Sequence, residues 1–168
     1  MKKIMLGLFI FGLTIQSFAQ VINDGQLPEV EVRAVNYKYL NEVNNNSADP
    51  TVKLLELEVA KFDPRGTDLY EDEYNYYKVS FYIPDGNIVA AYDQNGKIIR
   101  TIEKFSDVKP PRAVINSVAK RFPGWVISKD VYKVSYHNER GTIKTYKLIL
   151  ENGDKTMRVK TDELGKFL

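Results

Sequence analysis

The chain has 168 residues, of which 24 are basic and 22 acidic, and it contains no cysteine. The absence of cysteine excludes a disulfide framework, a thiolate metal site and a catalytic thiol. Stability must therefore come from a hydrophobic core, and the chain is long enough to build one in a single compact domain.

The first 19 residues have the pattern of a signal peptide. Lys2 and Lys3 precede an apolar run at 4–15, which is too short to span a bilayer, and a Ser-Phe-Ala cleavage site follows at 17–19. We expect cleavage after Ala19 and export of a soluble chain to the periplasm or the medium. An uncleaved membrane anchor is the alternative, although no second hydrophobic segment follows.

Charge divides the expected mature chain into two parts. Residues 20–108 hold 16 acidic and nine basic side chains, whereas residues 109–168 hold six acidic and 13 basic ones, so their net charges are −7 and +7. Such a dipole can orient a charged partner, or the two parts can attract each other. Both alternatives stay open.

Residues 20–48 are interpreted as an N-terminal extension, with a short strand at 30–32 where apolar and charged residues alternate. The first helix begins at Asp49 and Pro50, because the carboxylate can cap free backbone amides and proline fits the first turn. Apolar residues follow at helical spacing as far as Phe62, and a Pro-Arg-Gly sequence then ends the helix.

Alternation of apolar and polar residues predicts an antiparallel meander after this helix. Residues 76–83 alternate strictly, and two turn sequences then lead into expected strands at 88–92 and 97–103. Tyr76 and Tyr82 fall on the polar side of the first strand, so we expect them to point away from the helix.

A second helix and a second meander follow. The helix is expected to bury four apolar side chains at i, i+3, i+4 and i+7 spacing: Ile115, Val118, Ala119 and Phe122. Strands are expected at 125–137, 142–151 and 155–160, and residues 164–168 close the chain.

Residues 77–99 align without a gap with residues 146–168, and six pairs are identical. We interpret this repeat as one architectural unit used twice, at 49–105 and 109–168 of a single domain. The fold class predicted is α+β, a tandem repeat of one helix packed on an antiparallel β-meander. The repeated Asp-x-x-Gly-Lys sequence is interpreted as a tight turn with glycine at positive φ.

The sequence shows no catalytic constellation. His137 is the only histidine, and no phosphate-binding glycine motif is present. The acidic loop at 68–73 could hold calcium, but it lacks the regular spacing of a metal loop, and a solvated loop is the alternative. We therefore predict no enzyme, no cofactor and no metal site. A nucleic-acid partner is not expected, because the tyrosines interleaved with lysines are predicted to point inward.

A helix packed on one face of an antiparallel sheet leaves the other face open. The outward residues combine tyrosines in the first meander with cations in the second, Lys160 among them. Both side-chain types are frequent in protein recognition. The candidate partner-binding residues are Tyr76, Tyr82, Lys133, Lys147 and Arg158. A wetted face that binds nothing is the alternative.

Several motifs carry a resemblance to a known family. They are a helix that ends in Val-Ala-Lys-Arg-Phe-Pro at 118–123, the sequences Tyr-Lys-Val-Ser-Phe at 77–81 and Tyr-Lys-Leu-Ile-Leu at 146–150, and the two Asp-x-x-Gly-Lys turns. Over roughly residues 50–168 the chain resembles the β-lactamase-inhibitor-like, PepSY-like periplasmic family typical of Bacteroidetes. The resemblance implies tandem helix-plus-sheet units and no established enzymatic role. It does not carry over β-lactamase inhibition, because the inhibitor proteins are usually disulfide-bonded.

Taken together, these features predict an exported, non-catalytic binding module that recognises a protein or peptide through the open face of its sheet. The alternative is an envelope scaffold or stress protein that acts by self-association, without a discrete ligand.

Overall fold

A computed structural model describes residues 36–44 and 49–168 of the chain. The expected signal peptide and the strand expected at 30–32 lie outside these residues. The described elements, in chain order, are α1 (Tyr37–Val43), α2 (Pro50–Lys61), a 3-10 turn at Pro64–Gly66, β1 (Tyr76–Ile83), β2 (Gly86–Asp93), β3 (Ile98–Ser106), α3 (Arg112–Arg121), β4 (Val126–His137), β5 (Gly141–Asn152) and β6 (Lys155–Asp162).

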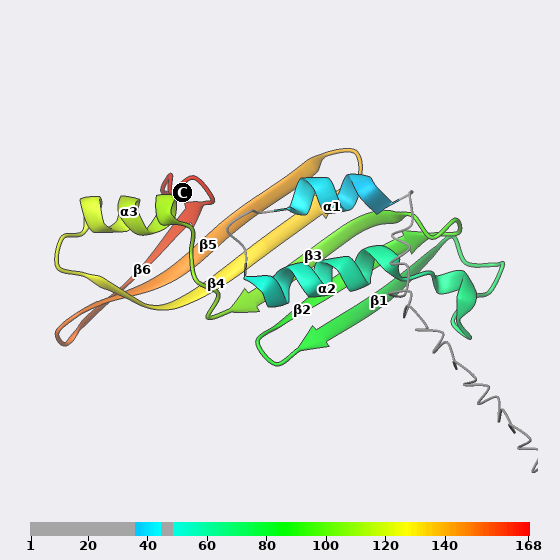
Figure 1. The fold of residues 1–168 in the computed structure, drawn as a ribbon, viewed down its shortest axis with the longest axis horizontal. Coiled ribbons are helices and arrows are strands. Elements are labelled where there is room, and N and C mark those ends of the chain that lie inside the picture. Colours follow the sequence, from blue (N-terminus) through cyan, green and yellow to red (C-terminus); the bar gives the residue numbers. More distant parts are fainter. Residues whose placement is uncertain (1–35, 45–48) are drawn as a thin grey trace, which may run out of the picture. The chain divides into compact units, whose positions relative to one another are not determined.

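The strands form one antiparallel sheet in the order β1-β2-β3-β4-β5-β6 (Figure 1). Strand β3 pairs directly with β4, although α3 separates them in sequence, and Lys104 lies opposite Lys133 in this pair. The two expected meanders are therefore one continuous sheet. The prediction of an α+β fold with an antiparallel meander is confirmed.

Helix α2 begins where the sequence predicts. The Asp49 side chain accepts a hydrogen bond of 2.9 Å from the Thr51 amide, and Pro50 occupies the first turn. Val59 is fully buried, and its carbonyl accepts a 2.7 Å hydrogen bond from the Tyr92 hydroxyl on β2. This bond satisfies a carbonyl of the last helical turn and joins α2 to the sheet.

Helix α1 was not predicted, because its sequence falls within the N-terminal extension. It buries Tyr39 and Val43. Just before it, the buried Asn36 donates hydrogen bonds to the carbonyls of Ala60 and Gly96 at 3.1 and 3.2 Å. The segment from Asn36 therefore packs with α2 on the domain, and α1 and α2 cover the same face of the sheet (Figure 1).

The expected apolar stripe of α3 is correct at Val118 and Phe122 and wrong at Ala119. Val114 and Val118 are buried, whereas Ile115 is half-buried and Ala119 is exposed. The row in contact with the core is thus spaced by four residues, and it continues to the half-buried Phe122. Side chains four apart share one helix face, so this row is narrower than the predicted stripe.

The two Asp-x-x-Gly-Lys sequences form turns with the same hydrogen bonds. Oδ1 of Asp93 accepts from the amides two and four residues further on, and Oδ1 of Asp162 does the same. Gly96 and Gly165 have φ values of 73° and 82°. The prediction of tight turns with glycine at positive φ is confirmed.

Candidate functional site: the open face of the sheet

All five predicted partner-binding residues lie on the face of the sheet opposite the helices. Tyr76 and Tyr82 are 65% and 74% exposed, Lys147 and Arg158 are exposed, and Lys133 is half-buried. Their inward neighbours are buried, as Tyr77 is on β1, or half-buried, as Val159 is on β6. The predicted inside and outside of these strands are therefore correct, while the binding role of the five residues stays a prediction.

The structure brings only part of this set together. Lys133, Lys147 and Arg158 lie on the consecutive strands β4, β5 and β6, whereas both tyrosines lie on the edge strand β1. The sheet register places Tyr82 in the same cross-strand row as Lys133, with β2 and β3 between them. Three strand spacings correspond to about 14 Å. Tyr76 lies at the opposite end of β1, so it belongs to a different part of the face.

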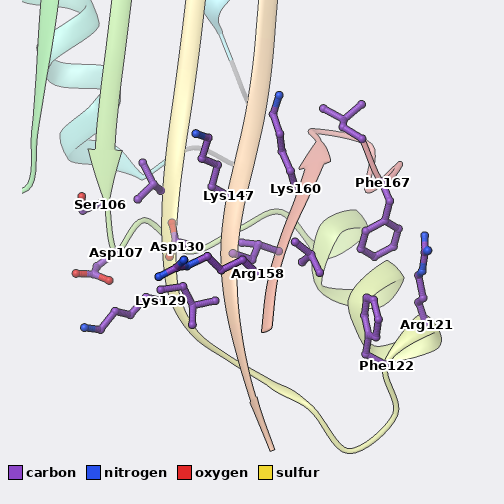
Figure 2. Close-up of a pocket in the computed structure, with 15 residues that line it drawn as sticks. Ser106, Asp107, Arg121, Phe122, Lys129, Asp130, Lys147, Arg158, Lys160 and Phe167 are labelled. Carbon is purple, nitrogen blue, oxygen red and sulfur yellow. The ribbon is translucent and has the colours of Figure 1, made fainter. Parts of the chain in front are cut away.

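A groove of about 700 Å³ lies over the strands of the second half (Figure 2). It follows two neighbouring rows of the sheet register. The first row holds Ser106, Val131, Lys147 and Lys160, and the second holds Lys129, Ile149 and Arg158. Since side chains of one row point to the same face, each row contributes cations around an apolar centre. We call this site the basic groove.

The basic groove contains residues that sequence reasoning missed. Lys129 and the apolar Val131 and Ile149 were not among the candidates, and Lys160 was expected to point outward but was not selected. Alternation along single strands predicts the face of each residue. The grouping depends on the register between β4 and β5, which shifts between Ile127 and Lys129, and on the register between β5 and β6. The predicted meander did not fix which residues lie opposite each other.

The cations of the groove have no acidic partner among the described residues. Lys147 lies directly opposite Lys160, an arrangement of like charges that destabilises a sheet. Ion pairs do form elsewhere in the described part, as between Lys144 and Glu163 at 3.4 Å. None of them involves the four groove cations Lys129, Lys147, Arg158 and Lys160.

Two aspartates lie at the β3–β4 end of the groove. Oδ2 of Asp130 accepts a 3.1 Å hydrogen bond from the Val108 amide, and its carbonyl accepts one of 3.1 Å from the Asp107 amide. Burial raises the pKa of Asp130 to about 6. This carboxyl thus holds the chain after β3, and the cations are concentrated toward β5 and β6.

The opposite end of the groove is closed by residues from the C-terminal segment and α3. Phe167 bridges to Thr161 on β6, and its ring packs edge-on against Phe122 with centroids 5.6 Å apart. The Arg121 guanidinium lies 4.6 Å from the centroid of the Phe167 ring (Figure 2). A cation stacked on an aromatic ring is held in place, so this wall adds positive charge to the groove.

A second cluster of ionisable groups lies inside the domain. Glu56 on α2 and Glu103 on β3 are only 3% and 1% exposed. Burial and mutual repulsion raise the pKa of Glu56, and burial raises the pKa of Glu103 even though Thr101 and Tyr39 donate hydrogen bonds to it. Because both carboxyl groups are shielded from solvent, the cluster has no access to a substrate in this conformation.

Within the described residues, no cluster of three or more histidine, aspartate or glutamate side chains has a metal-binding arrangement. No helix in the same part of the chain is long and apolar enough to cross a membrane.

Comparisons of the chain with protein-family models, with curated proteins and with solved structures find no match. The function is therefore inferred from the geometry and charge of the open face.

Proposed function

We propose that this protein is an exported, non-catalytic binding module that recognises a protein or peptide through the open face of its sheet. The observation that carries this proposal is the set of exposed cations around the apolar centre of the basic groove, none of which has an acidic partner within residues 36–44 and 49–168. Exposed Tyr82 adds an aromatic anchor on the same face. Aromatic side chains and arginine are enriched at interfaces, and complementary charges set the specificity and the association rate of a complex.

Export is proposed from the first 19 residues, which combine two lysines, a short apolar run and a small-residue cleavage site. The tandem-repeat, β-lactamase-inhibitor-like form of the fold is proposed on similar grounds. The gap-free alignment sets β1 and β2 over β5 and β6, and the turns at Asp93 and Asp162 have the same hydrogen bonds.

The test is cross-linked capture from envelope extract, with captured proteins identified by mass spectrometry. The exported chain is compared with the double variant Tyr82→Ala, Lys147→Ala. A matched control, Tyr37→Ala with Lys53→Ala, removes one exposed tyrosine and one exposed lysine from α1 and α2, which cover the other face of the sheet. We expect a partner that the wild type and the control capture and the face variant loses.

The same experiment can contradict the proposal. Both face residues are exposed, so their replacement should leave the unfolding midpoint almost unchanged. Unfolding of the double variant would show that the face is assigned wrongly, and equal capture by both variants would show that recognition does not use this face.

A second candidate, self-association into an envelope scaffold, is favoured by one observation. The acidic and basic parts of the expected mature chain carry −7 and +7, which permits head-to-tail attraction between copies. Concentration-dependent assembly in size-exclusion chromatography at low salt would support this candidate, and a monomer at all concentrations would contradict it.

A further inference from the structure

We propose that the basic groove binds an acidic, extended segment of a partner protein, with carboxylate side chains set among apolar ones. The inference rests on the proposed function and adds the chemistry of the partner. It commits to the second half of the sheet, where the groove lies, rather than to the tyrosines of β1.

The charge of the groove is complementary to that of an acidic segment. Lys147 and Lys160 are direct cross-strand neighbours, and Arg158 follows two residues away on the same face of β6. Lys129 lies in the adjoining row, across Ile149 from Arg158. Each of these positions would be stabilised by a carboxylate, and within the described residues no acidic side chain pairs with any of them. An acidic ligand would remove the repulsion between Lys147 and Lys160.

The spacing of the cations can be compared with the side-chain spacing of an extended peptide. Neighbours in a row are one strand spacing apart, about 4.8 Å, and Arg158 and Lys160 are separated by about 7 Å along their strand. Side chains on one side of an extended chain are also about 7 Å apart. In the sheet register Lys147 and Lys160 share one row and Lys129 and Arg158 share the next, so the cations form a two-row patch in which Arg158 and Lys160 have the period of an extended peptide. A single phosphate or lipid headgroup would instead need cations that converge on one point.

The apolar centre of the groove offers a surface for apolar side chains of the segment. Val131 and Ile149 lie between the cations, and the exposed Leu168 lies at the β6 end. The Leu168 amide donates a 2.9 Å hydrogen bond to the Lys160 carbonyl, which holds this end beside β6. Apolar side chains on the groove-facing side of the segment can cover this surface, so we expect acidic residues alone to bind more weakly than a segment whose groove-facing side carries both glutamate and valine.

The test is fluorescence anisotropy of a labelled eight-residue peptide with the sequence Glu-Glu-Val-Val repeated twice, titrated with the exported chain. Each side of this peptide, when extended, carries both glutamate and valine. The charge control has glutamine in place of every glutamate. Groove variants are Lys147→Gln, Arg158→Gln and Lys160→Gln. Matched control variants are Lys78→Gln and Lys104→Gln, which remove exposed lysines of the same face outside the groove.

We expect the glutamate peptide to bind, its affinity to fall as salt rises, and the glutamine peptide to bind at least about tenfold more weakly. Each groove variant should weaken binding by about tenfold, and the two control variants should have little effect. Equal binding of both peptides, or wild-type affinity in all three groove variants, would overturn the proposal.

Two further measurements distinguish other occupants. Phosphatidylglycerol vesicles that bind through the groove cations, while the peptide does not bind, would overturn the proposal in favour of a membrane. Self-association that is lost both in the groove variants and when the acidic loop at 68–73 is neutralised would overturn it in favour of a second copy of this chain.

Failure of this inference is distinguishable from failure of the proposed function. If the extract yields a face-dependent partner but the acidic peptide does not bind, the binding module stands and its acidic ligand is wrong. If the face variant captures the same proteins as the wild type, and in equal amounts, both proposals are wrong.

Discussion

The Tyr39 hydroxyl on α1 donates a hydrogen bond of 2.9 Å to Oε1 of Glu103 on β3. Thr101 donates to the same oxygen at 2.7 Å, and Glu56 on α2 lies close enough for its charge to act on Glu103. A buried carboxyl thus links both N-terminal helices to the middle of the sheet. Lys144 on β5 contributes an opposing positive charge, and its side chain is only 8% exposed.

This cluster predicts that stability falls as the pH rises. Burial raises the pKa of Glu56 and of Glu103 in the folded chain, so the folded state holds these protons more tightly than the unfolded state does. The stabilising contribution is therefore complete below the ordinary glutamate pKa of about 4.3 and is lost as the pH rises above it. We expect the free energy of unfolding in urea to be about 1 to 3 kcal/mol lower at alkaline pH than near pH 5.

The variant Glu56→Gln tests the cause of this pH dependence. It keeps the shape of the side chain but cannot ionise, so the curve of unfolding free energy against pH should become flatter. The control is Glu58→Gln on the exposed side of the same helix, which should keep the wild-type slope. A slope that Glu56→Gln does not change would show that other groups are responsible.

The bond between Tyr92 and Val59 predicts a loss of stability in Tyr92→Phe. The variant keeps the ring and removes only the hydroxyl, which leaves the buried carbonyl of Val59 without this donor. A lost buried hydrogen bond costs about 1 to 2 kcal/mol, to be measured by chemical denaturation. Tyr82→Phe on the exposed face is the matched control, and an equal effect of both changes would contradict the prediction.

The turn at Gly165 should be far less tolerant of a side chain than the turn at Gly153. Both glycines have positive φ, so an alanine costs about 1 kcal/mol in backbone strain at either site. At Gly165 the new Cβ would also lie 2.6 Å from the Ala113 carbonyl oxygen and would collide with Ser117 of α3, whereas at Gly153 it meets nothing within 4 Å. We expect Gly165→Ala to lower the thermal midpoint by several degrees more than Gly153→Ala. Equal midpoints would show that α3 does not pack on this turn.

Elements with a strong local signal were predictable from the sequence. The alternation in β1 assigned Tyr76 and Tyr82 to the open face, and Asp49 marked the start of α2 through its cap. Helix α1 was missed because it is only seven residues long, has no side-chain cap and buries just Tyr39 and Val43. Propensity gives little information over so short a segment.

Features that depend on long-range pairing were not predictable. Strand β3 pairs with β4 although α3 separates them in sequence, and in this pair Lys104 lies opposite Lys133. Alternation within one strand does not indicate which strand lies next to it. The basic groove depends on the register within the second meander, because Lys160 lies opposite Lys147, and Lys129 in the adjoining row, only at the observed alignment of β4, β5 and β6. Individual cations could therefore be assigned to a face, but their common site could not.

The pair formed by Lys147 and Lys160 predicts a conflict between stability and binding. In Lys160→Glu an ion pair replaces two opposed like charges, which should raise the free energy of unfolding by about 0.2 to 1 kcal/mol. The same change puts a negative charge into the basic groove, so binding of the acidic peptide should be lost.

The matched control is Lys104→Glu, which makes the same exchange opposite Lys133 but outside the groove. It should give a similar gain in urea denaturation and leave the anisotropy titration almost unchanged. A gain in stability without loss of binding in Lys160→Glu would show that the opposed lysines do not serve an acidic ligand. A loss of stability in both variants would contradict repulsion between the opposed lysines of each pair.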